Sequence, residues 1–104
     1  MSSSGGAVHY NMNEFQRACV ATCLRVLREK GFSDCRFREV TGKTERYFVA
    51  SVSVAERHYE IYVYDDEAGL AIDKQWFPCE RPDFRSSKDL IQAFSRMLSD
   101  KLVV

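Results

Sequence analysis

Residues 47 to 77 alternate between hydrophobic and polar positions with a period of two over most of their length. β-Branched and aromatic residues that alternate in this way are typical of strands with one buried face. Turn-forming residues divide this region and the residues before it, so we expect four strands at residues 34–41, 46–54, 57–65 and 70–77. Pro78 and Pro82 should end the sheet, because proline donates no backbone hydrogen bond.

Hydrophobic residues recur at helical spacing before this region. We expect the first helix at residues 12–30, with Asn11 as its N-cap and Glu14 as the capping-box partner. Gly31 should take a left-handed conformation after the last turn. The hydrophobic positions cover roughly half of the circumference, more than the stripe of about 100° that packing on one sheet requires. This helix should therefore also contact the second helix or another subunit.

The second helix should begin after Ser86, since Ser86 and Asp89 have the spacing of a capping box. Hydrophobic residues continue from there at a spacing of three and four. The expected order is α-β-β-β-β-α, an α+β fold in which a four-stranded antiparallel meander carries both helices on one face. Residues 1–9 are small and polar and predict a flexible leader, so a single domain is expected at residues 10–104.

The composition argues against several classes of protein. At 104 residues the chain can bury one core, and 15 Lys and Arg balance 15 Asp and Glu, so no net charge favours nucleic acid or an anionic membrane. The sequence shows neither an apolar run of about 18 residues nor a secretory signal pattern, which predicts a cytoplasmic protein with reduced cysteines. Cys19 and Cys23 lie one helical turn apart, which differs from the C-x₂-C spacing of zinc and redox sites and predicts small core residues.

Residues with catalytic potential are few. His58 and Glu60 should share a strand face and could form an acid–base pair, but the sequence does not identify the third member of a catalytic triad. The acidic turn at residues 65–67 lacks the ligand spacing of a calcium loop, so we expect a solvated turn. No nucleophile elbow, P-loop or dinucleotide fingerprint occurs. The sequence therefore predicts a non-catalytic protein with neither cofactor nor metal.

The period of two assigns the strand residues to two faces. The inner face is expected to hold Phe37, Phe48, Ala50, Val52, Ile61, Val63, Leu70 and Ile72. The open face is expected to hold Arg36, Arg38, Tyr47, Val49, His58, Tyr62, Tyr64, Gln75 and Phe77. Tyrosine and arginine are enriched at protein interfaces, so this face is a candidate binding surface. The alternative is that cross-strand tyrosine pairs only stabilise the sheet.

The leading hypothesis is a protein-interaction domain that forms a homodimer or binds another protein through the open face. Its predicted interaction surface comprises Arg36, Arg38, Tyr47, Val49, His58, Tyr62 and Tyr64. A second hypothesis is a small apolar ligand held between the first helix and a curled, cystatin-like sheet, with Trp76 and Phe77 at the rim. A third is stacking of single-stranded nucleic acid on the open face. The element order differs from that of an RNA-recognition motif and has one strand more than a double-stranded RNA-binding domain.

Overall fold

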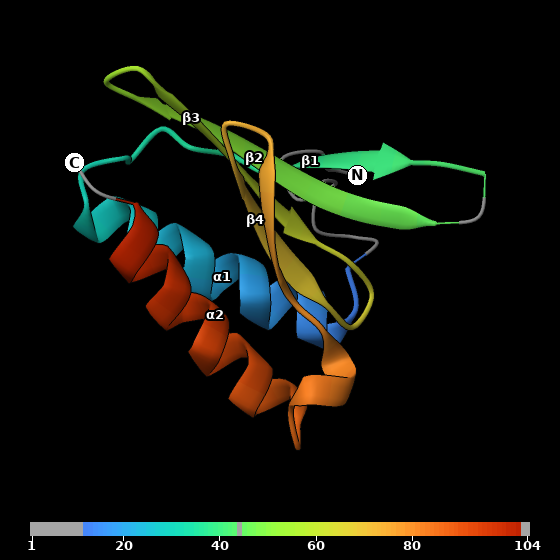
Figure 1. Cartoon of the computed structure of the whole chain (residues 1–104). Coiled ribbons are helices and arrows are strands. Elements are labelled where there is room, and N and C mark those ends of the chain that lie inside the picture. Colours follow the sequence, from blue (N-terminus) through green and yellow to red (C-terminus); the bar gives the residue numbers. More distant parts are fainter. Residues whose placement is uncertain (1–11, 44, 103–104) are drawn as a thin grey trace.

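The computed structural model describes residues 12–43 and 45–102, which form two α-helices and an antiparallel sheet of five strands (Figure 1). The elements are, in order, α1 (Glu14–Glu29), β1 (Arg38–Thr41), β2 (Arg46–Val54), β3 (Arg57–Val63), β4 (Ala68–Ile72), β5 (Gln75–Cys79), the short 3₁₀ helix η2 (Arg81–Asp83) and α2 (Ser87–Lys101). The prediction of an α+β fold with an antiparallel sheet is confirmed. The predicted leader lies outside the described residues.

The predicted strand count is wrong, because residues 70–77 belong to a hairpin rather than to one strand. β4 ends at Ile72 and β5 begins at Gln75. Asp73 and Lys74, the two residues between them, have φ angles of 49° and 74°. Two consecutive positive φ angles are typical of a two-residue type I′ turn, whose twist matches that of the flanking strands. Lysine rarely adopts this conformation, so the sequence carries only a weak signal for the turn.

α1 begins two residues later than predicted, and Asn13 is its N-cap. The Gln16 backbone N–H donates to Asn13 Oδ1 over 2.7 Å, and the Asn13 backbone N–H donates to Gln16 Oε1 over 3.0 Å. This reciprocal pair is a capping box. A cap at Asn13 leaves Met12 just before the helix, where its side chain is buried in the core. The predicted cap, Asn11, lies outside the described residues.

The other helix ends agree with the sequence. Gly31 follows α1 with a φ angle of 98°, and the Phe32 backbone N–H donates to the Leu27 carbonyl oxygen over 2.8 Å, as in a Schellman ending. Ser86 is the N-cap of α2, since its Oγ accepts a hydrogen bond from the Asp89 backbone N–H over 3.2 Å. These local signals therefore identified the C-terminal end of α1 and the N-terminal end of α2.

The core lies between the helices and one face of the sheet, here called the inner face. α1 and α2 pack against each other, which accounts for the wide hydrophobic surface of α1, and Figure 1 shows them side by side below the strands. The buried cluster includes Phe37, Phe48, Ala50, Val52, Tyr59, Ile61, Val63 and Leu70 from the sheet region, and Cys19, Val20, Cys23, Leu27, Leu90, Phe94 and Leu98 from the helices.

Gln75 and Phe77, which were predicted on the open face, lie on the inner one. Strand pairing places Gln75 opposite Ile72 and Phe77 opposite Leu70, and paired residues point to the same side. Phe77 packs against the core, with Lys101 Nζ 4.3 Å from its ring centroid. The error follows from the hairpin, because a two-residue turn reverses the alternation that one continuous strand would have kept.

The four cysteines are free thiols. Cys19, Cys23 and Cys79 are buried in the core, as predicted for small core residues, and Cys35 is partly buried against it. Burial raises the pKa of the Cys23 thiol well above its ordinary value, and contact with Cys19 raises it further. This thiol therefore stays protonated in the folded protein at neutral pH.

Candidate functional site

Four aromatic side chains gather on the sheet face that points away from the core, here called the open face. They are Tyr47 of β2, Tyr62 of β3, Tyr64 directly after β3 and Trp76 of β5, and together they form the aromatic cluster. β2 pairs with β3, and β4 lies between β3 and β5. The cluster therefore spans most of the width of the sheet.

The rings of the aromatic cluster contact one another directly. Tyr62 and Tyr64 stack with an interplanar angle of 8° and centroids 6.2 Å apart, while Tyr47 lies 5.9 Å and 5.0 Å from them. Trp76 meets the same two rings edge-on, with centroids at 5.4 Å and 6.5 Å. These distances are those of favourable aromatic pairs. Trp76 is nevertheless 44% exposed, the only large hydrophobic side chain within residues 12–43 and 45–102 that is exposed.

Trp76 lies over Gly69, a glycine of β4. A Cβ atom added at Gly69 would overlap the six-membered part of the Trp76 ring. Ala71, which pairs with Trp76, is also small. The two small residues leave the space in which the indole lies against the sheet, and aromatic cover of a strand glycine is a recurrent device in sheets. Sequence reasoning did not place Trp76 on this face, although the small residues Gly69 and Ala71 were a signal.

The predicted interaction surface is brought together in part. Arg38 lies on β1 opposite Val49 and is exposed, whereas Arg36 precedes β1 and is also exposed. Val49 pairs with Tyr62 on the open face, but its side chain is only 2% exposed. Val49 therefore supports the aromatic cluster from below and offers almost no surface for contact.

The pKa values of two tyrosines reflect their surroundings. Burial raises the pKa of Tyr62, and its hydrogen bond to Glu60 Oε1, 3.1 Å long, raises it further. The pKa of Tyr64 is raised by burial first and then by the neighbouring Tyr47, Glu45 and Glu67. Both phenols are therefore held in the neutral form, which keeps the centre of the aromatic cluster uncharged.

A polar row lies beside the aromatic cluster. Ser53 pairs with His58, and Ser53 Oγ is 3.2 Å from His58 Nδ1. His58 Nε2 is 3.7 Å from Glu60 Oε2. The order hydroxyl, imidazole, carboxylate resembles a hydrolytic triad, and Ser53 is the third member that the sequence alone did not identify. Ser53 and His58 are exposed, however, and Glu60 also accepts the hydrogen bond from Tyr62, so this row lacks the water-excluded setting of a catalytic serine.

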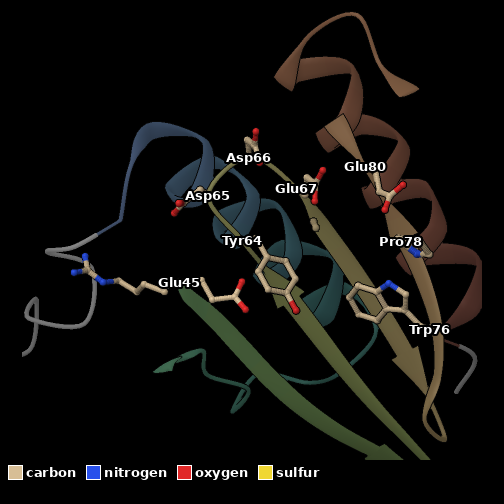
Figure 2. Close-up of a pocket in the computed structure, with 10 residues that line it drawn as sticks. Glu45, Tyr64, Asp65, Asp66, Glu67, Trp76, Pro78 and Glu80 are labelled. Atoms are coloured by element: carbon tan, nitrogen blue, oxygen red, sulfur yellow. The ribbon is translucent and has the colours of Figure 1, made fainter. Parts of the chain in front are cut away.

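A pocket of about 450 Å³ adjoins the aromatic cluster at one end of the sheet, where β2 begins and β5 ends (Figure 2). Tyr64 and Trp76 supply its aromatic wall. Five carboxyl side chains also line it, and we call it the acidic pocket: Glu45, Asp65, Asp66, Glu67 and Glu80. Figure 2 shows these carboxyl groups in an arc around Tyr64 and Trp76. The acidic turn that the sequence predicted as merely solvated is thus part of a pocket wall.

Neighbouring elements hold this wall in place. Asn13 Nδ2 donates to the Asp65 carbonyl oxygen over 3.0 Å, which ties the turn after β3 to the start of α1. The Arg81 backbone N–H donates to Glu67 Oε2 over 3.4 Å. Arg46 also lines the pocket, but its Nε is 3.0 Å from Glu39 Oε2. The pocket therefore carries an excess of negative charge on a defined backbone.

The chain matches no protein-family model, no curated protein and no solved structure. Among the residues that the structure describes, no group of three or more His, Cys, Asp or Glu side chains could hold a metal ion. No helix in the same part of the chain has the length and apolar character needed to cross a membrane. The open face itself is therefore the feature from which a function can be inferred.

Proposed function

We propose that this protein is a small, non-catalytic protein-interaction domain that self-associates through the open face of its sheet. The observation that carries the proposal is the exposure of Trp76 within the aromatic cluster. Stabilisation of the sheet would explain the contacts among the tyrosines, but it does not explain why nearly half of the indole is exposed to water. Tryptophan and tyrosine are enriched among the residues that contribute most to binding, and an exposed aromatic patch is typical of an interface.

The rigidity of the aromatic cluster also favours binding. Each of its rings contacts at least two others, and Trp76 is seated on Gly69. Side chains that are already ordered lose little conformational entropy when a partner covers them. The open face therefore supports association better than four flexible side chains of the same area would.

The two other hypotheses receive less support. The space between α1 and the sheet is filled by buried side chains, among them Cys19, Cys23 and Ile61, each with no exposed surface. Trp76 and Phe77 point to opposite faces of β5 and form no common rim. For nucleic acid, five carboxylates beside the aromatic cluster would repel the phosphate backbone.

The test is to replace Tyr62 and Tyr64 together by serine and to measure the molecular mass by sedimentation equilibrium. Truncation of an interface hot spot costs about 2 kcal/mol, so the double variant should dissociate where the wild type is dimeric. The control is the double replacement by phenylalanine, which keeps both rings and should keep the dimer. The proposal is wrong if the wild type stays monomeric at millimolar concentration, or if the serine variant associates as strongly as the wild type.

A further inference from the structure

The open face carries exposed arginines at one edge and reaches the acidic pocket at the other. Arg38 stands on β1 with an exposed side chain, and Arg36 lies two residues before it. The acidic pocket lies across the strand ends from β2 to β5, and it reaches the opposite edge through Pro78 of β5 and Glu80 directly after it. Strand pairing connects the two edges in one row that runs Arg38, Val49, Tyr62, Gly69 and Pro78. Pro78, at the far end of this row, lines the acidic pocket.

Tyr62 is the middle residue of this row, two strands from each end. A twofold axis that runs along β3 at Tyr62, between two sheets facing each other, therefore places Arg38 of one copy over Pro78 of the other. The same operation brings the second Arg38 to the second pocket, since a twofold interface repeats each contact. With strands about 4.8 Å apart, each arginine lies roughly 10 Å to the side of the axis. The aromatic clusters meet between the two arginine contacts.

We infer that the acidic pocket binds the guanidinium group of Arg38 from a second copy of this chain. The inference rests on the proposed self-association. It adds the direction of the twofold axis and the contact between Arg38 and the acidic pocket. A guanidinium group suits this pocket, because carboxylates accept its paired N–H groups and an indole ring attracts its positive charge. Trp76 and Glu80 line the pocket and would supply these two interactions.

The charges of the pocket are not balanced within one chain. In residues 12–43 and 45–102, no Lys or Arg forms an ion pair with Glu45, Asp66 or Glu80. A twofold axis across the strands would set Arg38 against Arg38 and pocket against pocket, and like charges across an interface disfavour that arrangement. Charge complementarity therefore selects the axis along the strands and a second copy as the occupant.

The test reverses the charges of the two residues proposed to meet across the interface, Arg38 and Glu80. Arg38→Glu and Glu80→Arg should each weaken the dimer about tenfold or more, because each places like charges in both contacts. A mixture of the two variants should form a heterodimer close to wild-type affinity, since residues 38 and 80 then carry opposite charges in both contacts. Glu80 suits the exchange because it is exposed and its side chain makes no capping bond to η2. Sedimentation gives the affinities, and native mass spectrometry identifies the mixed dimer.

Two controls match the changes in net charge. Arg96→Glu on α2 and Glu29→Arg at the end of α1 alter exposed residues away from the open face and should leave the dimer unchanged. Circular dichroism verifies that each variant is folded. If a charge reversal unfolds the chain, Arg38→Gln and Glu80→Gln replace it, and each should still weaken the dimer.

The possible results separate this inference from the proposed function. If the serine variant at Tyr62 and Tyr64 dissociates but the charge variants bind like wild type, the open face is the interface and the assignment of Arg38 to the pocket is wrong. If the variants are weak and their mixture stays weak, the symmetry is wrong. If the wild type is monomeric, both fail. Binding of an arginine-containing peptide, but not its citrulline analogue, to such a monomer would assign the pocket to another protein.

Discussion

The two faces of the sheet are built from alternate residues of the same strands, yet they hold their aromatic residues differently. Phe48 and Tyr59 of the inner face are at most 1% exposed, because the helices cover them. Tyr47, next to Phe48 in sequence, and Tyr62, on the same strand as Tyr59, lie on the open face and are covered only by one another and by neighbouring side chains. The helices thus complete the core on one side, whereas the other side has no second layer within the described chain.

This difference indicates which face stabilises the fold. Full burial of an apolar side chain contributes about 1.5–3 kcal/mol, whereas a partly exposed cross-strand pair contributes about 0.2–1 kcal/mol. The inner face should therefore dominate the free energy of unfolding. The open face can carry exposed aromatic residues because the stability of the domain depends far less on them than on the core.

The largest expected contrast lies between two consecutive residues of β2. Phe48→Ala should lower the free energy of unfolding by about 3–5 kcal/mol, because it opens a cavity in the core. Tyr47→Ala should lower it by about 1 kcal/mol or less, because it removes only contacts at a partly exposed surface. Urea unfolding, at a protein concentration low enough to keep the chain monomeric, measures both free energies. Equal losses would show that the two faces contribute equally to stability.

Two glycines sharpen the comparison for different reasons. Gly69→Val should cost about 1–3 kcal/mol and lift the indole off the sheet, because the new side chain occupies the place of the Trp76 ring. Since Trp76 is the single tryptophan, its emission should shift to the red. Gly31→Val should cost on the order of 1 kcal/mol through its positive φ angle, with tryptophan emission unchanged.

These outcomes can be told apart by fluorescence and urea unfolding together. A red shift in the Gly31 variant would mean that the end of α1 influences the open face. Unchanged emission in the Gly69 variant would contradict the position of the indole over β4.

A smaller effect is expected at the turn that brings Trp76 to the open face. Lys74→Gly should raise the free energy of unfolding by up to about 1 kcal/mol, because glycine adopts a φ angle of 74° without strain. Gln75→Gly is the matched control, since it places glycine inside β5 and should lower stability by about 0.5–1 kcal/mol. Thermal or urea unfolding measures both changes. A loss of stability in the Lys74 variant would argue against the type I′ turn.

The smallest effect concerns pH. The folded-state pKa values of Tyr62 and Tyr64 are raised, so their contribution to stability is complete below the unfolded value near pH 10 and is lost as the pH rises through the folded values. Replacing both by phenylalanine should reduce the loss of stability above pH 10. Cys23, whose raised pKa acts in the same direction, remains in both proteins and cancels in the difference. Equal pH slopes above pH 10 would contradict the prediction.

Local signals in the sequence predicted much of the fold. The alternating residues identified β2 with its observed bounds, and the predicted break between residues 41 and 46 and the capping residue Ser86 divided the chain correctly. Residues predicted for the inner face, such as Phe48 and Ile61, are buried in the core. These features depend on residues close in the chain, so their pattern is visible without knowledge of tertiary contacts.

The remaining parts of the site depend on contacts that the sequence does not show. The β4–β5 hairpin was missed because an Asp-Lys turn lacks the usual glycine, so Trp76 was not assigned to the open face. The acidic pocket joins Glu45, Asp66 and Glu80 from three separate segments. Their proximity follows from strand register rather than from spacing, and an isolated acidic turn gives no indication of it.

The strand order has a consequence for how the chain folds. Each strand pairs with the next one along the chain, so every pairing in the sheet closes a short loop at low entropic cost. Such hairpins form within microseconds in isolated peptides. The contact between α1 and α2 instead joins the two ends of the described chain and closes the longest loop. The contact that completes the core thus has the largest entropic cost of loop closure. Its formation is therefore expected to slow folding more than any strand pairing does.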